Sequence, residues 1–111
     1  MDRSNTIYLI AETFTLDDLG QQIPAEEPRA VYCDIESING SEWFQANQQG
    51  MNPQHRVRMF KYDYQGETIV NIGGTLEGGV LTGGKRYGVY RTYERRTDEI
   101  ELYLELKAGV S

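Results

Sequence analysis

YGVYRTYERRTDEIELYLEL, residues 87–106, is the stretch of sequence that decides the predicted fold. Its second half alternates strictly, which predicts an inner face made of Ile100, Leu102, Leu104 and Leu106. The same alternation predicts a solvent-exposed face made of Glu99, Glu101, Tyr103 and Glu105. The first half is rich in aromatic and β-branched residues, and the polar residues 94–98 are typical of a turn. The stretch therefore predicts a β-hairpin that anchors a sheet.

The length and composition predict a single domain over residues 1–111, because 111 residues support one hydrophobic core. Hydrophobic residues make up 39% and charged residues 25%, which is typical of a folded protein, and 12 glycines favour a turn-rich, all-β class. No apolar run approaches the roughly 20 residues that cross a bilayer. The first residues do not resemble a signal peptide, so we expect a soluble protein made in the cytoplasm, with no membrane contact.

A single cysteine, Cys33, excludes an internal disulfide. Val31 and Ile35 alternate with it along a strand-like segment, so we expect Cys33 to be a small buried hydrophobic residue rather than a reactive thiol.

Four further segments have strand-like patterns: residues 6–16, 29–36, 56–62 and 67–72. We expect the last two to pair with each other as a second hairpin. Glycine and two prolines interrupt the acidic residues 17–28, which predicts a mobile connecting loop. Residues 73–84 contain six glycines and predict either a flexible loop or an extended glycine-bearing ribbon.

One short helix is predicted, with Ser41 as its cap and Gly50 where it ends. Trp43 and Phe44 are expected to pin this helix to the sheet rather than to stack on bases. The fold class that follows is all-β, a small antiparallel β-barrel or sandwich of about six strands with one short α-helix.

The charges are unevenly distributed along the chain. Residues 1–50 have a formal charge of −7, residues 51–96 of +4 and residues 97–111 of −3. Such asymmetry suits a subunit that meets other copies or a partner through faces of opposite sign. The alternative is that these charges only solvate the outer sides of strands.

The sequence argues against an enzyme. One histidine, His55, and one cysteine cannot build a His/Cys metal site, and the phosphate-binding, nucleotide-binding, nucleophile-elbow and zinc-protease motifs are absent. We therefore expect no catalytic residues, no cofactor and no metal.

A nucleic-acid-binding barrel is one alternative function, because basic and aromatic residues are interleaved. The basic members are Arg56, Arg58, Lys61, Lys85, Arg86, Arg91, Arg95 and Arg96. The aromatic members are Phe60, Tyr62, Tyr64, Tyr87, Tyr90 and Tyr93. Protein interfaces are enriched in the same residue types, and the acidic half of the chain would weaken binding to phosphates. A general protein-interaction module is a further alternative.

Two runs resemble a known family. SINGSEWFQANQQGMNPQHRVRMFKYDYQGE, residues 37–67, and KRYGVYRTYERRTDEIELYLE, residues 85–105, resemble the head-closure proteins of long-tailed bacteriophages, also called head-completion, stopper or head-tail joining proteins. The likeness lies in residues 42–50 with their aromatic pair, the Tyr-Asp-Tyr-x-Gly-Glu turn at 62–67, Tyr-Arg-Thr-Tyr at 90–93 and the strand at 99–104. The glycine-rich residues 73–84 depart from it, since the family usually has a short turn there.

The resemblance implies a small β-barrel that assembles as a ring, normally of a dozen subunits, beneath the portal and its adaptor. The ring would close the DNA-filled capsid, contact the packaged DNA in its channel and offer the tail proteins a docking surface. The protein would then be located in the virion, at the head-tail interface.

Two sets of site residues follow for such a ring. The neutral, amide-rich segment predicts a channel-closing loop that contains Gln45, Asn47, Gln48, Gln49, Asn52 and Gln54, with residues 73–84 as its rival. The predicted subunit and partner interface contains Arg56, Arg58, Tyr62, Tyr64, Arg86, Arg91, Arg95 and Arg96.

Overall fold

The computed structural model of the chain describes residues 5–106. Its strands are β1 (Asn5–Leu16), β2 (Gln22–Ser37), β3 (Pro53–Phe60), β4 (Ile69–Glu77), β5 (Val80–Glu94) and β6 (Glu99–Leu106). A helix, α1 (Gly40–Gln48), separates β2 from β3, and a 3-10 turn, η1 (Lys61–Asp63), follows β3. No helix in this part of the chain has the length and apolar character needed to cross a membrane.

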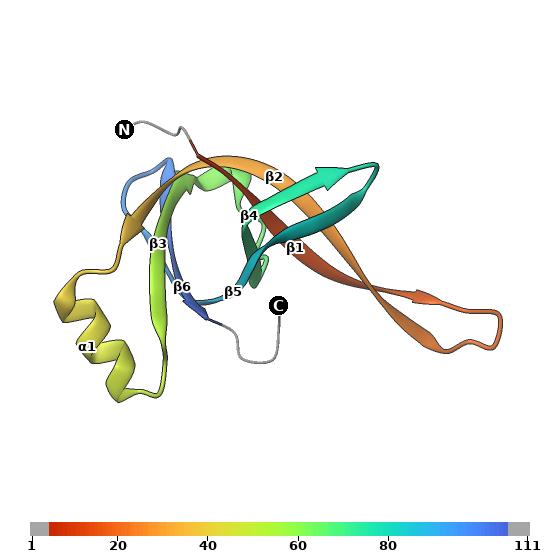
Figure 1. The fold of residues 1–111 in the computed structure, drawn as a ribbon, viewed down its shortest axis with the longest axis horizontal. Coiled ribbons are helices and arrows are strands. Elements are labelled where there is room, and N and C mark those ends of the chain that lie inside the picture. Colours follow the sequence, from red (N-terminus) through yellow and green to blue (C-terminus); the bar gives the residue numbers. More distant parts are fainter. Residues whose placement is uncertain (1–4, 107–111) are drawn as a thin grey trace.

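The strands are antiparallel and close into a barrel in the order β1-β2-β3-β6-β5-β4 (Figure 1). The ring closes through β1 and β4, which pair over four residues, from Ile7 opposite Ile72 to Ile10 opposite Ile69. This arrangement confirms the predicted all-β class with one short helix. The predicted hairpin at the end of the chain is also confirmed, because β5 and β6 pair from Tyr87–Leu106 to Glu94–Ile100.

The core fills the barrel with side chains from all six strands. It comprises Ile7, Leu9, Val31, Cys33, Val57, Met59, Val70, Tyr87, Ile100, Leu102 and Leu104. Cys33 has no exposed surface, as predicted, and burial, with a smaller effect of Asp34, raises the pKa of its thiol to about 12.

The outer face of β6 corrects one prediction. Ile100, Leu102 and Leu104 point into the core as expected, but Leu106 is 44% exposed. Glu101 and Tyr103 do lie on the opposite face, yet only 4% and 7% of their surface is exposed. That face is therefore covered rather than solvated.

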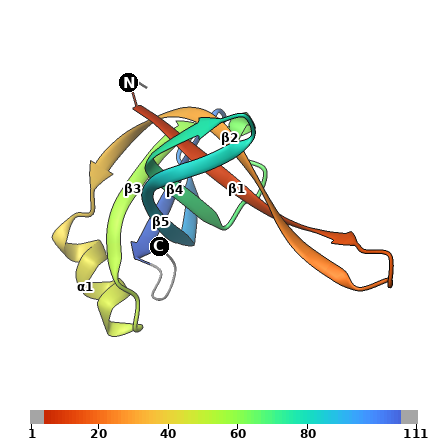
Figure 2. The same cartoon turned by 45° about the vertical axis from the view of Figure 1, so that its right-hand side comes forward.

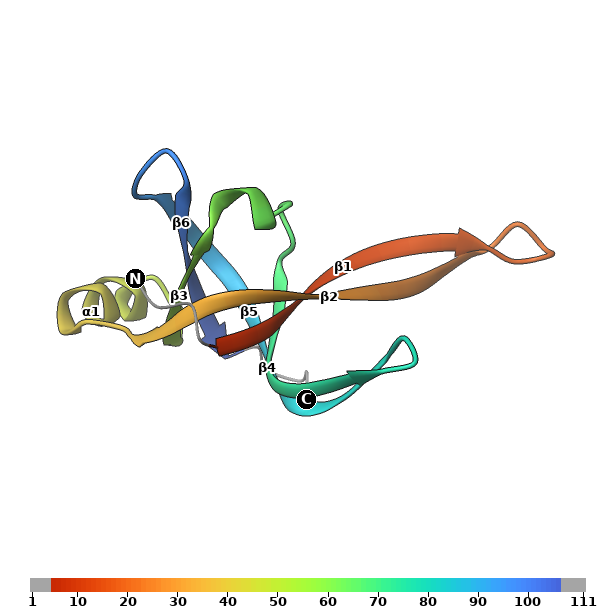
Figure 3. The ribbon, with the colours of Figure 1, turned by 90° about the horizontal axis from the view of Figure 1, so that it is seen from above.

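The predicted mobile loop at residues 17–28 is wrong. Strand β2 begins at Gln22 and pairs with β1 from Leu16–Gln22 to Asn5–Cys33, so most of that segment is strand. The tip is a tight turn in which Asp17 Oδ1 accepts the amide hydrogens of Leu19 and Gln21 at 2.9 and 2.8 Å. Residues 11–27 project beyond the barrel as a two-stranded arm, here called the β1–β2 arm (Figure 3).

A second projection is the β4–β5 hairpin, which contains the glycine-rich residues 73–84. Of the two alternatives predicted for this segment, the ribbon is observed, because Leu76 pairs with Leu81 and Glu77 with Val80. Gly78 and Gly79 form the turn with φ of 57° and 80°, a conformation that favours glycine at both positions. The predicted pairing of residues 56–62 with 67–72 is wrong, because β3 pairs with β2 and β6.

Helix α1 stands at the side of the barrel away from the arm (Figure 2). Its cap is Asn39 rather than Ser41, since Asn39 Oδ1 accepts the amide hydrogen of Glu42 at 2.8 Å. The helix ends just before Gly50, as predicted. Trp43 and Phe44 do not pin it to the sheet, because they are 46% and 59% exposed, and Ala46 is its buried residue.

Candidate functional site

The outer face of the barrel carries ordered rows of charged and aromatic side chains across four strands. The strand register places Glu36 opposite Arg56, Arg56 opposite Tyr103 and Tyr103 opposite Arg91. One row further along are Asp34, Arg58, Glu101 and Tyr93. Directly opposed residues point to the same face of a sheet. We call the set Glu36, Arg56, Arg58, Arg91, Tyr93, Arg95, Glu101 and Tyr103 the outer charged face.

Glu101 is the centre of this face. Its Oε2 lies 3.4 Å from Arg58, 3.6 Å from Arg95 and 3.9 Å from Arg56. Its Oε1 accepts the hydroxyl hydrogen of Tyr103 at 3.1 Å, and burial together with Glu101 raises the pKa of Tyr103. A buried carboxylate is stable only where such partners replace water. Glu101 therefore joins β3, β6 and the β5–β6 turn by charge as well as by their backbone.

In three ion pairs of β5 and the β5–β6 turn the cation lies outside and the carboxylate beneath, whereas Glu94 and Glu26 are more exposed than their partners Lys61 and Arg86. The Arg91 side chain is 49% exposed against 12% for Glu42, and Arg96 is 72% exposed against 9% for Glu99. Arg95 is 37% exposed, whereas Glu101 is 5% exposed. Solvent therefore meets more of these three guanidinium groups than of their carboxylates, although the formal charges of the pairs cancel and Glu94 and Asp98 are exposed in the same segment.

Helix α1 joins the outer charged face through Glu42. Its carboxylate binds the guanidinium of Arg91 and accepts the hydroxyl hydrogen of Tyr90 at 3.1 Å. Burial, and then the charge of Glu42, raise the pKa of Tyr90. A hollow of about 130 Å³ lies between the helix and β5, lined by polar residues and by Ala46 and Met51. Arg91 also stacks over the Tyr103 ring, 4.2 Å from its centre.

The structure brings together only part of the predicted interface set. Arg56, Arg58, Arg91 and Arg95 share the outer charged face, and Arg96 lies in the adjoining turn. The other three predicted residues are elsewhere.

Tyr62 is 69% exposed on η1. Tyr64 packs against the core and donates its hydroxyl hydrogen to the Glu67 carbonyl at 2.7 Å, so it is a structural residue. Arg86 forms an ion pair with Glu26 at the side of the β1–β2 arm.

The predicted channel-closing segment is not a free loop. Gln45, Asn47 and Gln48 belong to α1, Gln49 and Asn52 lie in the turn after it, and Gln54 lies in β3. The segment is held at both ends, because the Met51 amide donates to the Ala46 carbonyl at 3.0 Å and the Leu106 amide donates to the Asn52 carbonyl at 3.2 Å. The six amide side chains are nevertheless exposed.

A second polar cluster fixes the base of the arm. Arg29 on β2 donates to Glu67 at 2.7 Å and to the Asp63 carbonyl at 2.6 Å, and Glu67 also accepts the Gln65 amide hydrogen at 2.8 Å. Burial opposes the charge of Glu67, but the hydrogen bonds from Arg29 and the backbone hold its pKa below the ordinary value. This cluster anchors the arm to the barrel.

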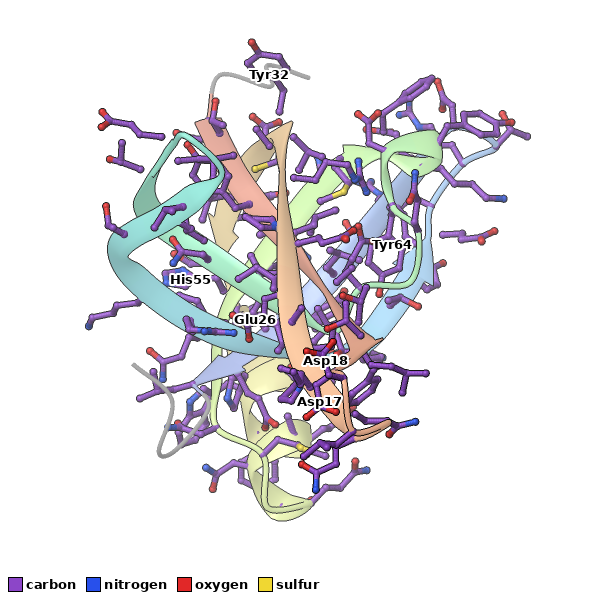
Figure 4. All side chains as sticks on the ribbon, turned by 90° about the vertical axis from the view of Figure 1, so that its right-hand side faces the viewer. Asp17, Asp18, Glu26, Tyr32, His55 and Tyr64 are labelled. Atoms are coloured by element: carbon purple, nitrogen blue, oxygen red, sulfur yellow. The ribbon has the colours of Figure 1, made fainter. Side chains whose placement is uncertain are left out.

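The arm exposes large apolar side chains together with acidic ones. Phe14, Leu16, Leu19 and Ile23 are 63%, 71%, 83% and 46% exposed. Asp17 and Asp18 lie together at its tip, which faces the viewer in Figure 4. Within residues 5–106, no three His, Cys, Asp or Glu side chains form a group that would hold a metal ion.

Sequence reasoning missed Glu36, Glu42 and Glu101 as members of the site, and it missed the arm. A signal for the carboxylates existed, since Arg56, Arg58 and Glu101 all occupy outward positions of alternating strands. These residues lie on the neighbouring strands β3 and β6, but the wrong prediction of a hairpin between residues 56–62 and 67–72 did not place those strands side by side.

Comparison of the chain with models of protein families, with curated proteins and with solved structures found no match.

Proposed function

We propose that this chain is a head-closure protein of a long-tailed bacteriophage. It is a structural virion protein, made in the host cytoplasm, that forms a ring beneath the portal and its adaptor. The ring closes the DNA-filled capsid and gives the tail its docking surface. The resemblance of residues 37–67 and 85–105 supplies the identity of this assembly.

The observation that carries the proposal is the β1–β2 arm. Its apolar side chains project from the barrel, where nothing in residues 5–106 covers Leu16 or Leu19, which are 71% and 83% exposed. Grouped apolar side chains on a surface mark a contact with another molecule. A small barrel with such a projecting apolar arm is suited to contacts with other subunits of an assembly.

The proposal is tested with filled, tailless capsids of the phage that lack this protein. The purified protein should bind capsids that carry portal and adaptor, protect the packaged DNA from nuclease and permit tails to join. Capsids without the adaptor are the control, and equal binding to both kinds of capsid contradicts the proposal.

The nucleic-acid-binding alternative is less well supported. Seven of its eight proposed cations form ion pairs with carboxylates of the same chain: Arg56, Arg58, Lys61, Arg86, Arg91, Arg95 and Arg96. Cations already paired have less charge to offer phosphates. Salt-sensitive binding of the free protein to oligonucleotides would favour this alternative, whereas a general interaction module would bind neither capsids nor oligonucleotides.

The amide-rich segment retains its proposed part in closing the channel, now as an ordered helix end with exposed amides. Replacing Gln48 and Gln49 by Glu should place like charges around the ring axis and raise nuclease access to packaged DNA. The matched control is the double change of Thr75 and Thr82 to Glu on the β4–β5 hairpin. Equal DNA retention in both variants argues against a channel position for the helix end, and leakage only in the control transfers the role to the glycine-rich hairpin.

A further inference from the structure

The β1–β2 arm combines negative charge with exposed apolar surface. Residues 11–27 contain Glu12, Asp17, Asp18, Glu26 and Glu27, and they contain no lysine or arginine. Six residues of each strand extend past the part of β1 that pairs with β4, which gives the arm a reach of about 20 Å. Its partner surface should therefore be cationic and partly apolar.

The same chain presents a surface of that kind on β5 and the β5–β6 turn. Arg91, Arg95 and Arg96 cover their carboxylate partners and are exposed themselves. Two acids of the same segment are also exposed, Glu94, which pairs with Lys61, and Asp98, so the exposed charge of this surface is positive by a small margin. Tyr93, which opposes Glu101 in the sheet, lies among them and is 57% exposed. Arginine and tyrosine are the residue types that protein interfaces favour.

These two surfaces cannot meet within one molecule. The arm tip and the β5–β6 turn lie toward opposite ends of a molecule 50 Å long (Figure 3). A contact between unlike patches at opposite ends joins copies head to tail, and a ring results where the rotation between copies closes.

We propose that the β1–β2 arm of one copy docks on the surface formed by Arg91, Tyr93, Arg95 and Arg96 of a second copy. The carboxylates of the arm face the guanidinium groups, and the apolar side chains of the arm pack on Tyr93. The inference deepens the proposed function and rests on it for the closed ring that the contact builds.

A second copy fits this arm better than an arm-to-arm contact does. Pairing two arms would bring Asp17 and Asp18 of each copy against the same acids of the other, and like charges at an interface oppose association. The charge complementarity between arm and turn has no such cost. A single narrow arm is also a small contact by the standard of stable interfaces, which is consistent with a ring that forms only at high local concentration on the portal.

Disulfide trapping tests the proposal on the purified protein. Leu19→Cys is placed at the arm tip of one variant and Tyr93→Cys on the receiving surface of another. The native Cys33 is fully buried and does not interfere, and the unmodified protein serves as the control. A mixture of the two variants at high concentration should give a disulfide-linked dimer, and each variant alone should give little.

A charge exchange then identifies the contact. Arg96→Glu on the Tyr93→Cys chain should lower the dimer yield several-fold, and Asp18→Arg on the Leu19→Cys chain should restore it. Rescue requires that the two side chains meet, so a general loss of folding cannot produce it. Circular dichroism of each variant checks the fold.

Two results overturn the proposal. One is dimerisation of either variant alone at the yield of the mixture. The other is absence of the mixed dimer at millimolar concentration while a small thiol reagent labels both cysteines completely. Binding to capsids is measured in a separate experiment. If the dimer is trapped but the protein does not bind capsids, the proposed function is refuted and the contact stands. If the protein binds capsids but no dimer is trapped, only the contact is refuted.

Discussion

Replacement of Glu101 by glutamine is the sharpest test of the outer charged face. The change keeps the size of the side chain and removes the charge that Arg58, Arg95 and Arg56 face at 3.4, 3.6 and 3.9 Å. The amide oxygen still accepts the hydroxyl hydrogen of Tyr103. The loss of stability therefore reports the removed charge together with an amide NH2 that cannot accept from the three arginines.

Its magnitude follows from burial. Breaking a fully buried ion pair by removing one partner costs about 3–5 kcal/mol. The side chains of Arg58, Arg56 and Arg95 are 18%, 21% and 37% exposed, so water compensates part of the loss. We expect Glu101→Gln to lower the free energy of unfolding by roughly 2–3 kcal/mol, which for a domain of this size lowers Tm by roughly 8–12 °C.

Urea denaturation and thermal melts measure the loss. Guanidinium chloride is avoided because its ions screen the interactions under test. Glu77→Gln, at an exposed position of β4, is the matched control and should change the free energy of unfolding by less than about 0.5 kcal/mol. If Glu101→Gln melts within two or three degrees of this control, the reasoning about the buried carboxylate is refuted.

Three further changes test other parts of the fold. Asn39→Ala should destabilise the protein by roughly 0.5–2 kcal/mol in urea and reduce its helical circular dichroism, because Asn39 caps α1; unchanged spectra and stability would show that the cap is unimportant. Gly84→Ala should cost more than the roughly 1–2 kcal/mol of a left-handed backbone, because its Cβ would overlap the side-chain oxygen of Asn71, and an unchanged Tm contradicts this. Acid should weaken the fold. Burial, and then the charge of Lys85, lower the pKa of His55 from 6.5, and, although burial opposes the charge, hydrogen bonds from Arg29 and the backbone lower the pKa of Glu67 from 4.5. The unfolded chain therefore binds more protons than the folded one, and stability falls as the pH drops below each of these values. Urea midpoints between pH 7 and 3 that stay constant or rise would contradict the last prediction.

The parts of the fold that depend on local pattern were predictable from the sequence. Ile100, Leu102 and Leu104 alternate with polar residues, and the pleat of a strand turns this period directly into an inner face. The helix between β2 and β3 was predictable from a different local signal, a capping residue followed by Gly50, although its cap was misplaced by two residues. The exposure of Trp43 and Phe44 on this helix was not predictable, since residue type alone does not say whether an aromatic side chain is buried in a core.

The pairing of strands was less predictable. Residues 56–62 were expected to pair with the next strand along the chain, but β3 lies between β2 and β6 in the closed barrel. Pairing between distant segments depends on how the whole sheet closes, which no single window of sequence contains. Because the partners were wrong, Arg58 and Glu101 were assigned to separate exposed surfaces.

The arm was missed because of its prolines. Pro24 and Pro28 normally argue against a strand, because proline lacks the amide hydrogen that a sheet requires. Along the arm, however, β1 and β2 pair only with each other, with Phe14 opposite Pro24. At the base of the arm Pro28 lies opposite Ile10, and β2 does not pair with β3 before Cys33. Each strand has a free edge, and proline is tolerated where its missing donor faces that edge.

The charges by segment predicted a polarised molecule but not which charges solvent meets. Four of the five acids of the arm are exposed, whereas Glu99 and Glu101 lie beneath Arg96 and Arg95, so burial decides the sign of each surface more than the count of residues does. Exposed charges and buried ion pairs should therefore respond differently to added salt. Ions screen exposed charges beyond about 8 Å at physiological ionic strength and act much less on buried pairs. Added salt should therefore weaken a contact between the arm and the arginine surface of another copy while the stability supplied by Glu101 changes little.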